Sequence, residues 1–310
     1  MNSFRYLQAV FLVGIVFSLV IGSAASVRAQ FVMMPDSTNN RMVLFSPLDG
    51  SVVNPSLFSL AAGTPIHAMQ VGNEIWVSEQ VGDRVSRWDF SGNALGAITG
   101  GLDNIRGMGR VGNTIYVTNA GTANGAPGAA VVMFDTAGNN LGFFSTVGTA
   151  PSPFGVLPHL GGILVSSSSA NDDIHRYTTA GASLGTFHNS TQLNFAEQMA
   201  YRNNGNVLVA GFSSPSGVFE LDVNTGAILN SWAPNGGQRG VYQLANGNIL
   251  WTNGSGAHVL DPNTGISTQV YIGGGRYLDY VDFNVIPEPG SGLIFCVAVG
   301  LGMLMRRRQR

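Results

Sequence analysis

The chain has 310 residues, only 10% of them charged, and its 15 basic residues are all Arg. The formal net charge is −2, but the middle of the chain is more acidic than this value indicates. Six Arg lie in the terminal segments, and residues 30–285 hold 9 Arg against 16 Asp and Glu. So acidic a surface excludes a nucleic-acid partner. The single cysteine, Cys296, excludes an internal disulfide.

Residues 1–29 have the layout of a secretory signal peptide. Arg5 supplies a short basic start, residues 9–21 form an apolar run, and small residues around Ala29 offer a cleavage site before Gln30. The alternative is an uncleaved anchor helix, for which the apolar run is short. In both cases the sequence predicts that the following domain is exported.

Residues 66–98 form the clearest copy of a repeat that accounts for most of the chain. Four apolar runs, at residues 66–69, 75–77, 85–88 and 94–98, are separated by Gly-Asn, Gly-Asp and Ser-Gly-Asn turn signals. This pattern is typical of four antiparallel strands joined by tight hairpins. One copy therefore predicts one four-stranded sheet.

A turn glycine after the third strand marks each copy of the repeat. It recurs at Gly50, Gly92, Gly138, Gly181, Gly226 and Gly265, in steps of 39 to 46 residues. Most copies place Asp, Ser or Thr before it, whose side chain can start a turn that glycine closes with a positive φ. A strand-rich period near 40 residues is typical of propeller blades. The sequence thus predicts an all-β fold, a six-bladed β-propeller over residues 30–285.

The first and last copies are incomplete in complementary ways. The first, from Phe31 to about Val53, has outer-strand material but no room for an inner strand, whereas residues 276–283 resemble an inner strand that no hairpin follows. We expect the C-terminal strand to complete the N-terminal blade. That pairing closes the ring and removes exposed sheet edges.

Polar residues recur at one position near the start of the inner strands. When the strands are aligned on Met69, Met108, Val156, Met199, Val241 and Leu278, the residues two positions earlier are His67, Arg106, Phe154, Glu197, Arg239 and Arg276. In a propeller these strands line the central channel, so the five polar residues should form a ring at one channel mouth. Their excess of cations predicts binding of an anion, such as a uronic-acid or sulfated sugar.

A purely structural role is the alternative for this ring. Its Arg side chains could pair with carboxylates of neighbouring blades, for which Glu79, Glu197 and Asp279 are available. Loss of the three Arg would then destabilise the fold, whereas loss of a binding site would not. The sequence leaves both interpretations open.

The Gly-Asn pair before apolar strands, as at residues 72–77, 112–117, 205–209 and 247–251, resembles NHL-type, SMP-30-like and streptogramin-lyase propellers. This likeness implies a fold and no shared activity. SMP-30-like gluconolactonases hold a divalent cation through an acid, Asn and Asp. Glu197, Asn119 and Asn253 could imitate part of that set, but no alignment carries the site over, and we expect no cofactor and no catalytic residue.

The C-terminal segment is the most specific motif of the chain. Pro287, Glu288 and Pro289 precede an apolar run at residues 293–305, which ends in an Arg-rich cluster at residues 306–310. This ordered arrangement resembles the PEP-CTERM sorting tail, also known as the ice-binding-protein C-terminal motif. The alternative is a simple tail anchor, although the run is shorter than a typical membrane span.

The PEP-CTERM resemblance implies processing by an exosortase in bacteria that make exopolysaccharide. We therefore expect an exported protein at the cell surface or in the extracellular matrix, held transiently in the membrane by its C-terminal helix. The predicted function is a monomeric binding or scaffold module, with an acidic exopolysaccharide as a candidate partner. The alternative is a divalent-cation-dependent propeller enzyme of lyase or lactonase type, which would use a cation such as Ca²⁺ at the channel mouth.

Overall fold

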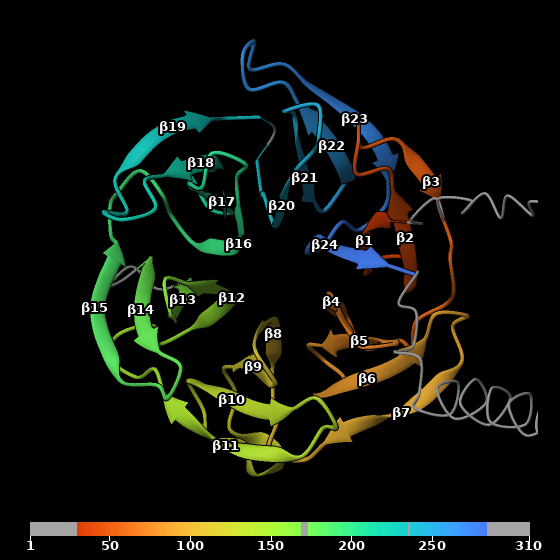
Figure 1. Cartoon of the computed structure of the whole chain (residues 1–310), viewed down its shortest axis with the longest axis vertical. Helices are drawn as coiled ribbons and strands as arrows, with labels where there is room; N and C mark the ends of the chain where they lie inside the picture. The colour runs from red at the N-terminus through yellow and green to blue at the C-terminus, as the bar shows by residue number, and fades with distance from the viewer. Residues whose placement is uncertain (1–29, 169–172, 235, 284–310) are drawn as a thin grey trace, which may run out of the picture.

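The computed structural model describes residues 30–168, 173–234 and 236–283, which fold into six four-stranded sheets arranged as a ring (Figure 1). The predicted signal peptide, Cys296, the Pro-Glu-Pro box and the apolar tail lie outside these residues. Within the described ranges, no helix combines the length and the apolar character needed to cross a bilayer.

Five blades are built from consecutive strands, the innermost first. The first contains β4 (Pro65–Val71), β5 (Glu74–Glu79), β6 (Arg84–Asp89) and β7 (Ala94–Thr99). The second contains β8 (Ile105–Val111), β9 (Thr114–Asn119), β10 (Ala130–Asp135) and β11 (Asn140–Ser145), with a short 3₁₀ turn, η1 (Ala123–Gly125), between β9 and β10. All pairs within a blade are antiparallel.

The next three blades follow the same order. The third contains β12 (Pro153–His159), β13 (Gly162–Ser167), β14 (Ile174–Thr178) and β15 (Ser183–His188). The fourth contains β16 (Ala196–Tyr201), β17 (Val207–Gly211), β18 (Gly217–Leu221) and β19 (Ile228–Trp232). The fifth contains β20 (Gly240–Gln243), β21 (Ile249–Asn253), β22 (Gly256–Leu260) and β23 (Ser267–Ile272).

The sixth blade joins the two ends of the ring. Its order is β24 (Asp279–Asp282), β1 (Gln30–Asp36), β2 (Arg41–Phe45) and β3 (Val52–Asn54), so the last strand is innermost (Figure 1). Phe31 pairs with Val281 and Met33 with Asp279. The predicted closure by the C-terminal strand is therefore confirmed.

The turn glycines that set the repeat period lie between the third and fourth strands of all six blades. Each has a positive φ, between 71° and 93°. In the first blade, the Asp89 carboxylate accepts the backbone N–H of Ser91, and Gly92 donates its N–H to the Asp89 carbonyl. The side chain starts the turn and the glycine closes it, as the sequence predicts.

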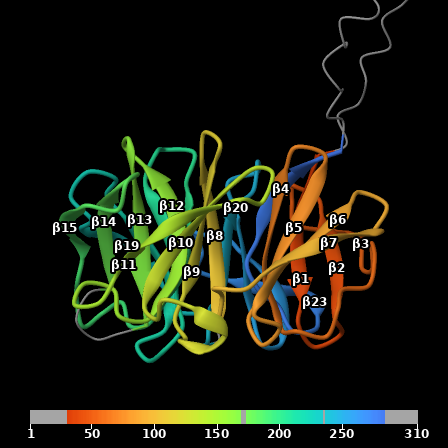
Figure 2. The ribbon, with the colours of Figure 1, turned by 90° about the horizontal axis from the view of Figure 1, so that it is seen from below.

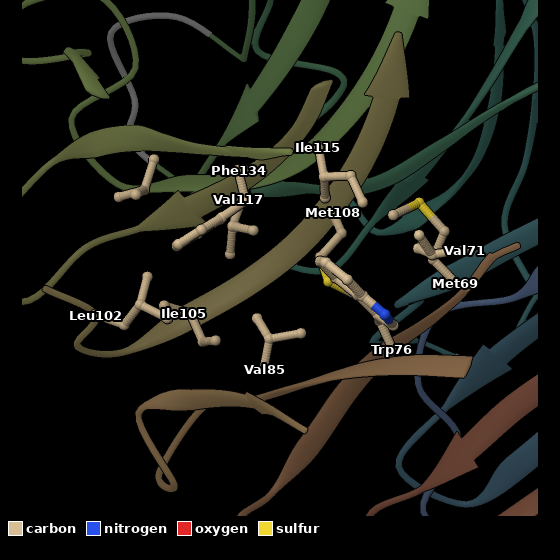
Figure 3. Close-up of a cluster of buried hydrophobic side chains, with 11 residues drawn as sticks. Met69, Val71, Trp76, Val85, Leu102, Ile105, Met108, Ile115, Val117 and Phe134 are labelled. Carbon is tan, nitrogen blue, oxygen red and sulfur yellow. The ribbon is translucent and has the colours of Figure 1, made fainter. Parts of the chain in front are cut away.

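The core lies between neighbouring blades and not in one central mass. Between the first two blades, Trp76 and Val85 pack with Ile105 and Met108 (Figure 3), and all four are nearly or fully buried. Equivalent clusters fill the other spaces between blades. Figure 2 shows the ring side-on, as a disc whose sheets stand roughly along its axis. Because neighbouring blades bury the faces of their inner strands against each other, polar side chains of these strands can gather at the two ends of the channel.

Candidate functional site

The inner strands begin at one end of the channel, where a repeated hydroxyl group sets their spacing. Ser78, Thr118, Ser166 and Thr252 occupy equivalent places in the second strands of four blades. In the third blade the Ser166 hydroxyl accepts the N–H of Gly155 at 2.7 Å and donates to the carbonyl of Glu197, in the next blade, at 2.5 Å. We call each such hydroxyl a latch, because it fixes a strand to its neighbour.

These latches define which residues share the mouth position. The Thr118 latch bonds Gly107 and Phe154, and the Thr252 latch bonds Gly240 and Arg276. The residues at the mouth position are therefore Ile66, Arg106, Phe154, Glu197, Arg239 and Arg276. The expectation that His67 stands in this register is wrong by one residue, since the Ser78 latch binds the backbone N–H of His67 itself.

Four charged residues of the predicted ring do meet at this end, which we call the arginine mouth: Arg106, Glu197, Arg239 and Arg276. The Glu197 side chain is almost wholly buried, and its pKa is raised to about 7. Burial is the cause, opposed by the positive charges of Arg239, Arg276 and Arg106 in that order. Burial and the repulsion of Arg239 lower the pKa of Arg276 to about 10. Among the residues that the structure describes, the mouth thus gathers three cations around the carboxyl group of Glu197.

The guanidinium groups are only partly engaged. Arg106 donates from Nη1 to the Ser152 hydroxyl and the Pro153 carbonyl, both at 3.0 Å, and Arg276 donates from Nε to Ser37 at 2.8 Å. The Arg239 side chain donates to no described residue, and the buried Nε atoms of Arg106 and Arg239 have no partner there. The arginine mouth therefore holds cationic donors that the described residues do not satisfy, which is a feature of anion sites.

An arc of three half-buried Phe rings joins two of these Arg residues. The Arg106 guanidinium lies 3.8 Å from the centre of Phe154, whose ring contacts Phe195, with centroids 4.7 Å apart. Phe195 contacts Phe212 at 5.0 Å, and Arg239 lies over Phe212. This aromatic arc can pack against the apolar face of a sugar ring whose carboxylate meets the Arg side chains.

Three large side chains close the channel just below the arginine mouth, and we call them the axial plug. Gln198 accepts the N–H groups of Val241 and Leu278 and donates to the Leu278 carbonyl. His67 accepts the Met108 N–H on Nδ1. The Tyr277 ring lies 5.5 Å from that of His67 and is nearly inaccessible to solvent. His67 therefore belongs to the plug.

The other carboxylates offered by the sequence do not neutralise the arginine mouth. Glu79 binds Arg84 at 2.8 Å, and the carboxylate of Asp279 lies 3.5 Å from His67. Glu197 makes no ion pair or hydrogen bond through its carboxylate to the described residues. A structural role by direct pairing thus applies to none of the three Arg.

Asn119 and Asn253, which could imitate a gluconolactonase cation site, are engaged in their own loops. The Asn119 amide donates to the carbonyls of Gly121 and Gly128. The Asn253 carbonyl oxygen accepts from Ser255. No group of three or more His, Cys, Asp or Glu side chains suited to a metal gathers among the residues that the structure describes.

The fold, but no family, emerges from comparison with known proteins. No protein-family model and no curated protein matches the chain. Among solved structures, a protein of unknown function from Bacteroides caccae is 15% identical, with a TM-score of 0.61 over 81% of this chain and 98% of that one. A chain of a nidogen/laminin complex is 10% identical, with a TM-score of 0.67 and the same coverage.

Virginiamycin B lyase from Staphylococcus aureus is also similar. It is 15% identical, with a TM-score of 0.53 over 74% of this chain and 76% of that chain. Identities this low show a shared propeller fold and nothing about activity.

Sequence reasoning missed the aromatic arc and the plug. The correct register of His67 was available, because the Gly-Asn turn that ends the inner strand, Gly72 or Gly112, lies six residues after Ile66 and Arg106 alike. Aligning the inner strands on Met69 and Met108 shifts them by one residue relative to these turns, which places His67 in the wrong register. Phe195 and Phe212 flank two different strands, and no period in the sequence connects them.

Proposed function

We propose that this protein is an exported binding module that holds an acidic saccharide at the arginine mouth. The observation that supports the proposal best is the buried convergence of Arg106, Arg239 and Arg276 around a single carboxyl group, with guanidinium donors that no described residue occupies. A uronic acid fits this chemistry, since its carboxylate accepts from Arg while its ring packs on the aromatic arc.

Thermal unfolding of the full chain tests the proposal. Oligogalacturonate should raise the unfolding temperature, because a ligand that binds only the folded state stabilises it by mass action. Arg239→Gln should weaken the affinity about 10- to 100-fold, the usual cost of a lost hydrogen bond to a charged group. Arg239 is the best position because its side chain makes no hydrogen bond within the described structure.

The triple variant Arg106→Gln, Arg239→Gln and Arg276→Gln completes this test. It should lose the response to oligogalacturonate while keeping most of its stability. An unfolding temperature that collapses in the variant, together with no response of the unaltered protein, would contradict the proposal and favour a structural role. A response to Ca²⁺ alone, reversed by EDTA, would favour the cation-dependent lyase or lactonase.

Binding should also depend on pH. A protonated Glu197 is neutral, so the mouth is more positive below the raised pKa of about 7 than above it. The affinity for a uronate, whose own carboxyl group stays ionised, should be greater at pH 6 than at pH 8. Calorimetric titration would measure the difference, and Glu197→Gln should remove it.

We propose further that Pro287, Glu288 and Pro289 direct sorting of the exported chain to the cell surface or matrix by an exosortase. Their order before the apolar run and the Arg cluster supports this. Replacing the three residues by Ala should leave the protein in the membrane fraction of an exosortase-bearing host. Release equal to that of the unaltered chain would contradict this part of the proposal.

A further inference from the structure

The end of the channel opposite the arginine mouth holds a cavity of about 390 Å³. It lies at the carboxyl ends of the inner strands, and His67 and Gln198 of the axial plug form its floor. A cavity of this volume has the size of a small-molecule site. We call it the methionine pocket, after Met69, Met108 and Met199 in its lining.

At the floor of the methionine pocket, an unused hydrogen-bond donor of His67 lies beside a carboxylate acceptor of Asp279. His67 accepts the Met108 N–H on Nδ1 at 2.9 Å, so its other ring nitrogen, Nε2, carries a proton. That nitrogen is buried without a hydrogen-bond partner in the described structure. The nearest carboxylate oxygen, Oδ2 of Asp279, is 3.5 Å away, beyond a good hydrogen bond.

The walls of the pocket are apolar and its rim is mixed. Val156, Leu157 and Leu278 line it together with the three Met side chains. Tyr242 adds a half-buried ring whose hydroxyl bonds to no other described residue. A second groove of about 410 Å³ shares Met69, Arg110 and Asp279 with the pocket.

We infer that the methionine pocket binds a neutral, hydroxyl-bearing molecule with an apolar face, about the size of one sugar ring. A hydroxyl group accepts from His67 Nε2 and donates to Asp279 Oδ2 at once, which neither a carboxylate nor an ammonium group can do. Between His67 and Asp279, a carboxylate would meet the like charge of Asp279, and an ammonium group would meet the His67 N–H. Arg110 also lines the pocket, and its Nε donates to the Gly112 carbonyl at 2.8 Å. The Met and Leu side chains cover the ring's apolar face.

This site is independent of the arginine mouth. The axial plug separates the two, and no residue that lines the methionine pocket belongs to the charged set of the mouth. A neutral pyranose and a phenol share the required chemistry. The two compounds are therefore compared as separate probes.

Methyl signals of methionine report on the pocket directly. The full chain, labelled with ¹³C at the Met methyl groups, is titrated with methyl β-glucopyranoside, with phenol and, separately, with tetramethylammonium. Either hydroxyl compound should shift the signals of Met69, Met108 and Met199 saturably. The signals of Met33 and Met42, buried in the sixth blade, should stay in place.

Matched variants assign any shift to the proposed contacts. Asp279→Leu should weaken binding at least tenfold, and Tyr242→Phe, which removes only one hydroxyl group, should weaken it severalfold while preserving the fold. Arg239→Gln, on the far side of the plug, should leave the titration unchanged. Oligogalacturonate binding should show the opposite dependence, so failure of one site is distinguishable from failure of the other.

Two results of the titration would overturn the inference, and one result with the variants would do so as well. One is the absence of any shift of these three Met signals with both hydroxyl compounds in a protein whose remaining spectrum is folded. The other is a response to tetramethylammonium alone, which would make the pocket a cation site. Binding that survives in both the Asp279→Leu and the Tyr242→Phe proteins would likewise contradict the proposed contacts.

Discussion

At the scale of single residues, Glu197 combines a buried carboxyl group with a strongly raised pKa. Its carboxyl group is buried, so folding disfavours the ionised form even though three Arg side chains are near. Its pKa of about 7 lies above the ordinary value of 4.5. The folded protein therefore holds a proton that the unfolded chain releases between these two pH values.

The sign of the pH dependence follows from this difference. Between about pH 4.5 and 7 the folded state binds more protons than the unfolded state, so its stability falls as pH rises. The loss from this group is on the order of 3 kcal/mol. Urea denaturation at pH 4.5 and pH 8 should show a drop that Glu197→Gln reduces.

Glu220 provides the matched control. Its pKa is lowered, because hydrogen bonds from Asn206, Asn204 and Asn230 outweigh its burial. Stability from Glu220 is therefore lost as pH falls, and Glu220→Gln should change the slope in the opposite direction to Glu197→Gln. Equal slopes in the two variants would show that Glu197 does not titrate as described.

At the scale of elements, the latches hold the inner strands at the spacing that the arginine mouth needs. Thr118 joins Gly107 of its own blade to Phe154 of the next. A side chain at Gly107 would collide with the Phe154 carbonyl, since an added Cβ would lie 2.3 Å from that oxygen. In the fourth blade Ala210 stands where four other blades have the hydroxyl, and Gln198 ties the adjoining strands instead.

Thr118→Val tests the latch with almost no change of shape. It leaves the Gly107 N–H and the Phe154 carbonyl without their buried partner, which should lower the free energy of unfolding by about 2 kcal/mol. Thr268→Val, at an exposed position of β23, should change it by less than about 0.5 kcal/mol. Equal effects of the two substitutions in urea denaturation would contradict the latch.

These elements also indicate what a sequence can and cannot predict. Gly92 and its five equivalents must adopt a positive φ, so a local requirement repeated six times predicts the blades and their number. The ring of Arg106, Arg239 and Arg276 follows from the same period. Phe195 and Phe212 come together only because separate strand ends meet at the channel, and His67 enters the plug because inner strands must be aligned by their turns.

At the scale of the whole molecule, closure depends on contacts between the two ends of the ring. Asp36, fully buried at the end of β1, accepts the N–H of Gly274 at 2.9 Å and the hydroxyl of Tyr271 at 2.5 Å. Hydrogen bonds from Asn39 and Tyr271 overcome burial and hold the pKa of Asp36 at about 2. This one carboxylate thereby joins the first hairpin to the strand and loop that precede β24.

Asp36→Asn should weaken the ring as a unit. The amide keeps the size of the carboxylate but cannot accept all of its hydrogen bonds, so the free energy of unfolding should fall by about 2 to 4 kcal/mol at neutral pH. The contribution of Asp36 to stability is lost below pH 3.8, as pH falls toward 2, so the difference between the variant and the unaltered chain should shrink there.

Asp49→Asn is the control for this prediction, since Asp49 lies in an exposed turn of the same blade. Its effect on urea denaturation should be much smaller. A cost for Asp36→Asn that does not exceed that of Asp49→Asn would show that closure does not depend on the buried carboxylate.

The hydrogen bonds of the axial plug should make the ring resistant to a pulling force. Because Gln198 binds backbone groups of Val241 and Leu278, the inner strands of three blades are tied across the axis. A force that pulls the two ends of the channel apart would act parallel to the inner strands. It would load the hydrogen bonds between neighbouring strands in shear, so that many of them resist the force together. The propeller would then act as a rigid connection between molecules bound on its two faces. It would not provide an open channel between them.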